Sequence, residues 1–319
     1  MAGIREVAKK AGVAISTVSY ALNGSDKISE DTRQRVLAVA EEIGYRPKLA
    51  ARTLKGSKTN IIGVYVAGFQ GEFYGELLDG MQQSLEQLGY DMVVTSGSRA
   101  RNFLPEELFD GAIVLDSNFS DELLFKYLDA GSKVVVMDRK INHKNARSVL
   151  LDNENGSVQA VNYLLTQNLQ HYYIISGPEN NYDVESRLTA ALQTFDAQGV
   201  EVKVFPGDFT EQSGMAFACE LLARQQDQVG IYTLNDNEAV GFYRTMFAHQ
   251  REIAGHYKLV GFDNNHATEL FSPVLPSISY HKHYWGETAA TTLVKLIENK
   301  AEVKNRQIRT EINFRKQQT

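Results

Sequence analysis

From residue 60 onward the chain alternates short apolar segments with longer amphipathic ones. Seven segments are apolar almost throughout, as parallel strands buried on both faces are: 60–66, 91–95, 111–115, 133–137, 172–176, 229–234 and 257–262. Between them, helical patterns cover 74–88, 121–130, 155–167, 185–198, 213–224 and 238–250. This alternation predicts doubly wound parallel α/β sheets. It is long enough for two lobes with a cleft, onto which loops at the carboxyl ends of the strands would face.

The first quarter of the chain has a different pattern. Apolar residues at spacings of three and four indicate one short helix over 4–11 and a second over 13–22, and Gly12 between them permits a sharp reversal. A third helix is expected to begin near Ser29, a good N-cap residue that two acidic residues follow. This layout predicts an all-α helix-turn-helix, which places its second helix in the major groove of DNA.

The distribution of charge agrees with a nucleic-acid partner at one end of the chain. Residues 1–60 contain eleven Lys or Arg and six Asp or Glu, a net charge of +5, whereas the whole chain carries −6. Residues 61–319 therefore carry −11. A basic head on an acidic body predicts that only the head binds the phosphate backbone.

Composition excludes several other classes of protein. With 319 residues and 43% hydrophobic content the chain can bury substantial cores and is expected to hold two or three domains. No apolar run approaches the roughly twenty residues that span a bilayer, and no secretory segment opens the chain, so we expect a cytoplasmic protein without membrane contact. The single cysteine, Cys219, excludes an internal disulfide and is expected in a helical core. No metal or cofactor is expected.

The motifs "VAKKAGVAISTVSYALNG", "ISEDTRQRV", "IGYRP" and "AARTL" resemble the DNA-binding headpiece and hinge of the LacI/GalR family of bacterial repressors. Further along, "EFYGELLDGMQQSLEQLGY", "VVVMDR", "NDNEAVG" and "LVGFDN" are similar to the family's periplasmic-binding-protein-like effector core. The resemblance implies a headpiece (1–46), a hinge helix or linker (47–59) and an effector-binding and dimerisation core (60–319). The core would comprise an N-lobe (60–151 and 281–310) and a C-lobe (152–280 and the C-terminal end), joined by three crossovers.

For DNA, the resemblance implies a homodimer on a pseudopalindromic operator whose half-sites lie about one helical turn apart. A hinge leucine would wedge into the minor groove, neighbouring basic residues would bind phosphate, and the second helix would contact bases. The implied contacts are Ile15, Ser16, Thr17, Tyr20, Asn23, Ser29, Arg52, Leu54 and Lys55. Ala14 stands where the family usually has a capping Ser, so either Ser16 caps the second helix or the helix begins later. Tyr20 replaces the more frequent Arg or His and cannot make a bidentate bond to guanine.

For the effector, the resemblance implies a small molecule held between the lobes. The implied contacts are Phe73, Tyr74, Asp138, Arg187, Phe209, Asn235, Asp263 and Tyr280. Acids, an amide and an arginine beside aromatic rings suit a mono- or oligosaccharide, because hydroxyls need donors and acceptors and the C–H face of a pyranose prefers an aromatic plane. A purine or an amino acid could use much the same set.

An enzyme on a Rossmann-like scaffold is the main alternative. The chain has no G-x-G-x-x-G that opens a helix after a predicted strand, no G-x-S-x-G, no P-loop and no H-E-x-x-H. His281 and His283 would share one face of a strand, but no further metal ligand is predicted beside them. The sequence therefore favours a transcriptional regulator, most simply a repressor of carbohydrate-utilisation genes, whose operator affinity an effector controls.

Overall fold

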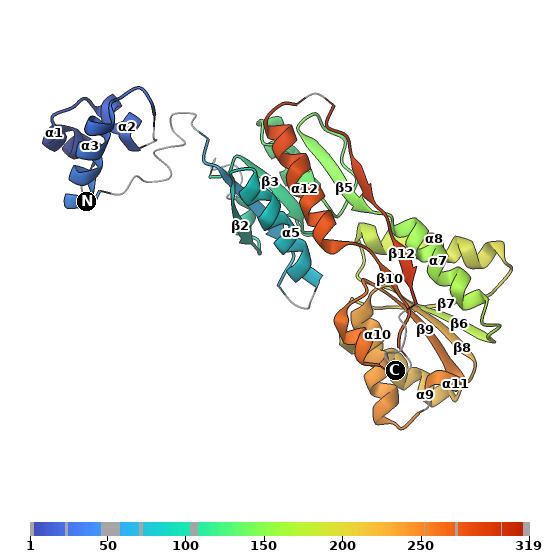
Figure 1. Cartoon of the computed structure of the whole chain (residues 1–319). Coiled ribbons are helices and arrows are strands. Elements are labelled where there is room, and N and C mark those ends of the chain that lie inside the picture. Colours follow the sequence, from blue (N-terminus) through green and yellow to red (C-terminus); the bar gives the residue numbers. More distant parts are fainter. Residues whose placement is uncertain are drawn as a thin grey trace. The chain divides into compact units, whose positions relative to one another are not determined.

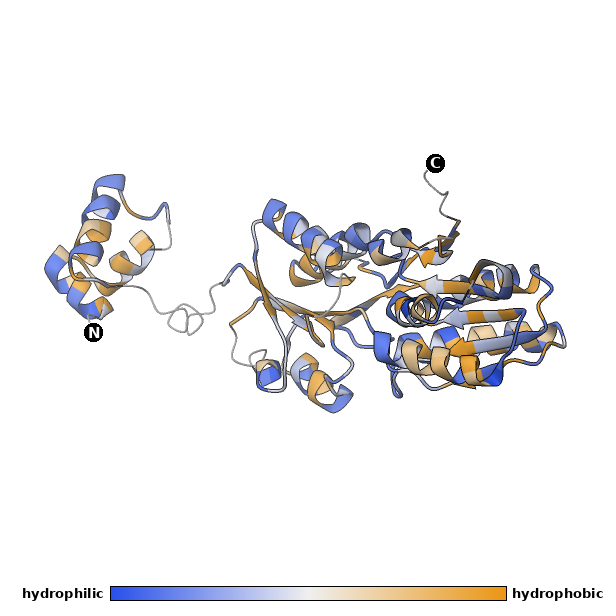
Figure 2. Ribbon diagram, turned by 90° about the horizontal axis from the view of Figure 1, so that it is seen from below, coloured by the Kyte–Doolittle hydropathy of each residue, from blue (hydrophilic) through white to orange (hydrophobic). Residues whose placement is uncertain are grey.

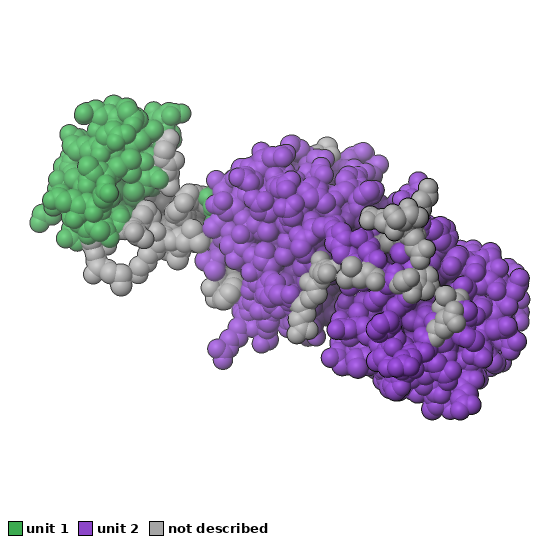
Figure 3. Space-filling view, turned by 60° about the horizontal axis from the view of Figure 1, so that its bottom comes forward, with its two compact units in different colours: residues 1–59 green, residues 60–319 purple. Residues whose placement is uncertain are grey.

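The computed structural model describes residues 3–22, 25–45, 58–69, 73–102, 108–251, 253–271, 274–300 and 302–314. The chain divides into two compact units, residues 1–59 and 60–319 (Figure 3). The first unit is a small helical cluster, and the second holds two α/β sheets with their helices (Figure 1).

The first unit has a helix-turn-helix, as the sequence predicts. Its helices are α1 (Ile4–Ala11), α2 (Ile15–Leu22) and α3 (Glu30–Glu42). Gly12 ends α1 in the left-handed conformation with φ of 66°, which a glycine adopts without strain. Val7, Val18 and Val36 contribute one fully buried side chain from each helix to a common core.

The N-terminal residues of α3 and α2 can be compared with the predicted N-caps. The Ser29 Oγ accepts a hydrogen bond from the backbone N–H of Thr32 at 3.3 Å, so Ser29 is the N-cap of α3. The expectation for α2 was wrong, because the helix begins at Ile15 and Ser16 lies inside its first turn. The carbonyl oxygen of Ala14 accepts from the backbone N–H groups of Thr17 and Val18.

Among the described residues of the second unit, the N-terminal sheet contains six strands. In spatial order they are β11 (Arg306–Ile308), β5 (Ala146–Leu151), β4 (Val134–Val136), β3 (Gly111–Leu115), β1 (Ile61–Val66) and β2 (Asp91–Thr95), and all adjacent pairs are parallel. Its helices are α5 (Phe73–Gln87), α6 (Asp121–Asp129) and α12 (Lys282–Ile297).

The described part of the C-terminal sheet also contains six strands. In spatial order they are β12 (Glu311–Asn313), β10 (Ser277–Ser279), β9 (Tyr257–Phe262), β8 (Val229–Thr233), β6 (His171–Ile175) and β7 (Lys203–Phe205). Only β12 is antiparallel to its neighbour. Its helices are α7 (Asn153–Leu165), α8 (Tyr182–Ala197), α9 (Glu211–Arg224), α10 (Asp236–Ala248), α11 (Ile253–His256) and the 3₁₀ helix η2 (His266–Leu270). The chain passes between the sheets after β5, after β10 and between β11 and β12, and the predicted two-lobed α/β fold is confirmed.

Alternating side chains of β1 show why an almost wholly apolar strand forms here. Ile62, Val64 and Val66 are buried in the same cluster as residues of α5 and α12, whereas Tyr65 joins a second cluster with residues of α6. Both faces of this sheet are therefore covered, as its sequence requires. In Figure 2 the helices beside the sheets carry both orange and blue residues, as amphipathic helices do.

Helices α5 and α12 lie side by side and touch through glycines (Figure 1). A Cβ atom added at Gly80 would lie 2.1 Å from the carbonyl oxygen of His283, and one added at Gly286 would lie 2.1 Å from that of Leu77. No side chain fits at either position unless the helix backbones separate. The rings of Phe73 and Trp285, from the first turns of the two helices, also meet edge to face with their centroids 6.2 Å apart.

Other expectations from the sequence need correction. Cys219 is exposed on α9, not part of a core. His281 is the residue before α12 and His283 lies within that helix, so they do not share the face of a strand. Within the described residues, no group of three or more His, Cys, Asp or Glu is placed to hold a metal, and no helix is both long and apolar enough to cross a bilayer.

Candidate functional site

The second unit contains a cavity of about 290 Å³ between its two lobes. Its walls come from the carboxyl ends of strands in both sheets and from the first turns of helices α5, α8, α10 and α12. Open α/β sheets bind their ligands in the crevice outside the carboxyl ends of the strands. The lining residues are Ala67, Phe73, Tyr74, Leu115, Ser117, Asp138, Leu151, Pro178, Asn181, Asp183, Arg187, Phe209, Asn235, Asn237, Asp263, Asn265 and Trp285.

Seven of the eight predicted effector residues line this cavity. The eighth, Tyr280, lies behind the wall, where its hydroxyl donates a hydrogen bond to Oδ1 of Asp263 at 2.9 Å. Tyr280 therefore orients a lining carboxylate, and this geometry gives it no direct place on the cavity surface.

Arg187 is the cation of the cavity wall and is 4% exposed. Its Nε donates to Oδ1 of Asn153 at 2.9 Å, and its Nη1 donates to the carbonyl oxygen of Leu234 at 2.6 Å. The guanidinium carbon lies 3.6 Å from the centre of the Phe262 ring, a stacked cation–π contact. These contacts hold the guanidinium plane in one orientation.

Two carboxyl groups lie near this guanidinium. Burial raises the pKa of both Asp183 and Asp263, and the positive charge of Arg187 acts in the opposite direction on each. Asp183 Oδ1 accepts from Nδ2 of Asn153 at 2.7 Å, and the backbone oxygen of Asp263 accepts from Nζ of Lys282 at 2.5 Å. The arrangement offers a ligand several acceptor oxygens beside a single guanidinium.

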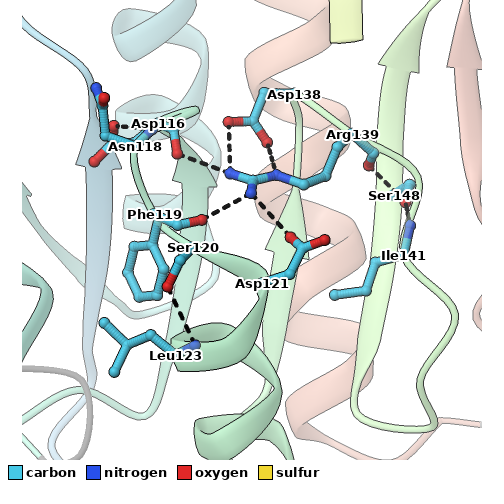
Figure 4. Close-up of polar contacts among 10 residues, drawn as sticks. All are labelled: Asp116, Asn118, Phe119, Ser120, Asp121, Leu123, Asp138, Arg139, Ile141 and Ser148. Atoms are coloured by element: carbon cyan, nitrogen blue, oxygen red, sulfur yellow. Dashed lines mark hydrogen bonds and ion pairs between the residues drawn. The ribbon is translucent and has the colours of Figure 1, made fainter. Parts of the chain in front are cut away.

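Asp138 is held in the opposite lobe by the residue that follows it. Arg139 donates from Nε and Nη2 to the two carboxylate oxygens of Asp138 at 3.0 and 3.1 Å (Figure 4). The same guanidinium donates to the carbonyl oxygens of Asp116 and Phe119 and to Oδ1 of Asp121. Burial raises the pKa of Asp138, and the bidentate bonds from Arg139 oppose that shift.

The C-lobe wall around Phe209 depends on the first turn of α10. Phe209 has a φ of 67°, which is unusual for a non-glycine residue. Its carbonyl oxygen accepts from Nδ2 of Asn235 at 3.0 Å, and its N–H donates to Oε1 of Glu238 at 3.1 Å. Asn235 also caps α10 through its Oδ1. Buried polar side chains thus hold an aromatic ring at the cavity.

Two buried carboxyls behind this wall make stability depend on pH. Burial raises the pKa of Asp236 to about 7 and that of Glu238 to about 8. The folded protein therefore binds these protons more tightly than the unfolded chain does. Stability is then expected to decline as the pH rises above the ordinary carboxyl range towards 7 and 8.

Between pH 6 and pH 7 the free energy of unfolding of the core should fall by about 2 kcal/mol. Asp236→Asn should remove about half of this slope, because the amide can keep both hydrogen bonds, from the Asn265 N–H and with the Ser277 hydroxyl, without titrating. Urea unfolding at several pH values measures the slope. A slope that the substitution leaves unchanged would assign the pH dependence to other groups.

The first unit presents the outer face of α2. Ile15 is 42% exposed and Tyr20 37% exposed, and Ser16 is also exposed. Thr17 is half-buried. Ser29 is exposed and caps α3. The other predicted DNA contacts, Asn23, Arg52, Leu54 and Lys55, lie outside the described residues, as does most of the predicted hinge.

Several lining residues were not predicted from the sequence. Asn181 and Asp183 come from the beginning of α8, four or more residues before the predicted Arg187, and Trp285 comes from the first turn of α12. Asn265 lies two residues after Asp263, and its Oδ1 is buried without a hydrogen-bond partner. Two features of the sequence could have indicated them. Asp183 lies one turn before Arg187 on the same helix face, and Trp285 is the only tryptophan of the chain.

A helix-turn-helix unit followed by a two-lobed core with a cavity at its strand ends defines a DNA-binding transcriptional regulator with a ligand-binding domain. Residues 3–48 match the sequence profile of "Bacterial regulatory proteins, lacI family", and residues 161–316 match that of a periplasmic binding protein-like domain. A solved sugar-binding transcriptional regulator of the LacI family from Enterococcus faecalis is 36% identical, with a TM-score of 0.76 over 81% of this chain and 97% of that one. The chain belongs to the LacI family of bacterial regulators.

Two further relatives extend over nearly the whole chain. The transcriptional regulator CelR, solved in complex with cellobiose, is 27% identical with a TM-score of 0.73, and the match covers 99% of both chains. The transcriptional repressor PurR of Vibrio campbellii is 27% identical over 94% of this chain and 93% of its own. Regulators of this type bind operator DNA as dimers and respond to small-molecule effectors.

Proposed function

We propose that this regulator represses carbohydrate-utilisation genes and that its effector is an unphosphorylated mono- or oligosaccharide bound in the cavity between the lobes. The observation that carries the proposal is the composition of the cavity wall: three carboxyl groups and several amides lie among aromatic rings, with one guanidinium. The sugar-binding relative from Enterococcus faecalis and the cellobiose complex of CelR support the same ligand class.

Hydrogen-bonding capacity explains the choice of a saccharide. Asp138, Asp183 and Asp263 present oxygens that accept from hydroxyl groups, and the amides can both donate and accept. Phe73, Trp285 and Phe209 provide apolar surface for the C–H faces of a sugar ring. Each hydroxyl of a saccharide both donates and accepts, so the mixed set of oxygens and amides suits it.

The charge of the wall argues against a phosphorylated ligand. Among the described lining residues Arg187 is the only cation, and two of its nitrogens already donate to protein oxygens. A phosphate would therefore meet three carboxyl groups without a matching cluster of donors. Phosphorylated sugars should bind far more weakly than their neutral parents.

On the DNA side, the proposed contacts are the predicted ones. Ile15, Ser16 and Tyr20 would contact bases, and Leu54 would enter the minor groove, with basic and hydroxyl side chains on phosphate. Closing the lobes around the effector would alter the core surfaces that hold two headpieces on one operator. Coupling of about 1–3 kcal/mol, or roughly 5- to 150-fold in operator affinity, is typical of such linkage.

A thermal-shift screen of the full-length protein tests the effector class. The panel pairs neutral sugars with their phosphates, for example glucose with glucose 6-phosphate and cellobiose with cellobiose 6-phosphate, and includes purine bases. A neutral sugar at 100 times its dissociation constant should stabilise the protein by about 2.7 kcal/mol and raise the melting temperature by several degrees. Stabilisation by a purine or by a sugar phosphate alone would contradict the proposed ligand class.

A further inference from the structure

Helix α2, the second helix of the helix-turn-helix, exposes apolar and hydroxyl-bearing side chains. Ile15 and Tyr20 are two of the three large hydrophobic side chains that are exposed among the described residues of the first unit. Between Ile15 and Leu22 the helix carries three aliphatic hydroxyls, from Ser16, Thr17 and Ser19, and the phenolic hydroxyl of Tyr20, but no acidic, basic or amide side chain. This composition restricts which features of a base pair the helix can distinguish.

The major groove offers two kinds of signal. Bidentate recognition of guanine or adenine requires Arg, Lys, Asn or Gln, and recognition of the cytosine amino group favours Asp or Glu. None of these residue types is present within α2. The hydroxyls of serine, threonine and tyrosine both donate and accept, so they discriminate weakly between bases. The remaining signal is the C5-methyl group of thymine, which prefers apolar contact.

The burial of the other apolar residues supports a role for the exposed ones. Val18 and Ala21 of α2 are buried against α1 and α3, so the core of the unit does not need Ile15 or Tyr20. Positive charge in this unit comes from outside α2, for example from Lys9, Lys10 and Lys27. The phosphate contacts can thus come from neighbouring segments, and α2 is left to contact base edges.

We propose that Ile15 and Tyr20 are specificity-determining residues that recognise thymine methyl groups in each operator half-site. The side chains pack against the methyl groups in the major groove and exclude water from them. The half-site beneath α2 is accordingly rich in A·T pairs, and its recognition depends on methyl contacts instead of bidentate hydrogen bonds. This inference rests on the proposed function, since it requires sequence-specific binding to a duplex.

The test begins with selection of binding sites from random duplex DNA by the full-length dimer. Each thymine of the enriched half-site is then replaced by deoxyuridine, in both half-sites at once, which removes only the methyl group. Burial of one methyl corresponds to about fourfold in affinity, so a contacted position should cost roughly fifteenfold in a symmetric operator. Dissociation constants are measured by fluorescence anisotropy at one fixed salt concentration.

Variants separate a side-chain contact from a change in DNA shape. Ile15→Ala and Tyr20→Ala should each bind less tightly and should lose the penalty for deoxyuridine at the positions they contact, because the methyl group has no partner. Leu37→Ala is the matched control: Leu37 is 37% exposed on α3, and this variant should keep the full penalty. Near-equal affinities of all proteins for unrelated DNA show that the headpiece is folded.

The outcomes distinguish the inference from the proposed function. Methyl recognition is overturned if the wild type binds the enriched operator equally well with deoxyuridine in place of thymine. It is also overturned if the loss of affinity on this replacement persists in both Ile15→Ala and Tyr20→Ala. Neither outcome contradicts the proposed function as a transcriptional regulator. Enrichment of G·C pairs at the positions beneath α2 overturns it as well. Failure to enrich any sequence contradicts the proposed function itself.

Discussion

Replacing Arg187 by alanine is expected to lower the affinity of the cavity for its saccharide at least 100-fold, or about 3 kcal/mol. The guanidinium is buried, stacks on Phe262 and is oriented by two hydrogen bonds, so its remaining N–H groups are available to a ligand at little entropic cost. Its removal also takes the nearby positive charge from the carboxyl group of Asp183 and leaves that of Asp263 with Lys282 alone. Isothermal titration calorimetry with the saccharide found in the thermal-shift screen measures the loss.

A matched control is available in the same lobe. Arg224 is the last residue of α9, its side chain is 44% exposed, and it forms an ion pair with Glu220 one turn earlier in the same helix. Arg224→Ala should bind the saccharide as tightly as the wild type. The titrations are run well below the melting temperature of each variant, because loss of a buried arginine also destabilises the fold. Wild-type affinity in Arg187→Ala would remove this arginine from the effector site.

Gly80→Ala is expected to destabilise the core by about 3 kcal/mol. The added Cβ would lie 2.1 Å from the carbonyl oxygen of His283, so α5 and α12 could not keep their present separation. A backbone oxygen cannot rotate away as a side chain can, and the two helices must move apart. Since Phe73 and Tyr74 begin α5 and Trp285 lies in α12, one wall of the cavity should move with them.

The same helix provides the control for this substitution. Gly75 is exposed within α5 and nothing lies within 4 Å of the position of its missing Cβ, so Gly75→Ala should stabilise the core by about 0.5–1 kcal/mol. Fluorescence of Trp285, the only tryptophan, follows urea unfolding of the lobe that contains both glycines. Equal unfolding midpoints for the two variants would contradict the close approach of α5 and α12.

Most of the apolar strands were predictable from the sequence, but β5, which carries an arginine and a serine, and most of the three-residue strands were not. Segments such as 111–115 and 229–233 are buried at every position, and an uninterrupted apolar run reveals them. Strands β7, β10, β11 and β12 have three residues each, and most residues of β7, β11 and β12 are not buried. Three residues are too few for a period to appear. Cys219 shows the converse error, since an apolar neighbourhood along a helix does not say which face a residue occupies.

Some residues of the cavity wall could likewise be predicted from the sequence, and others could not. Asp138, Asn235 and Asp263 directly follow or closely follow buried strands, and their motifs resemble those of the family, so their place on the wall could be predicted. Asn181 and Asp183 belong to a loop and the first turn of α8, where no pattern along the chain points to a ligand. Tyr280 was predicted at the cavity and lies behind Asp263 instead. The position of a residue in the sequence does not determine whether its side chain reaches the cavity surface or lies behind it.

Local patterns in the sequence determined the helix-turn-helix, the two α/β lobes and the residues at the ends of the apolar strands. They could do so because periodicity, helix caps and turn glycines act over a few neighbouring residues. Only the tertiary structure decided the separation of α5 and α12, the orientation of Arg187 by Asn153 and Leu234, and the contact of Phe209 with Glu238. These contacts join residues 29 to more than 200 positions apart in the sequence. They depend on how separately formed elements pack, which no local pattern encodes.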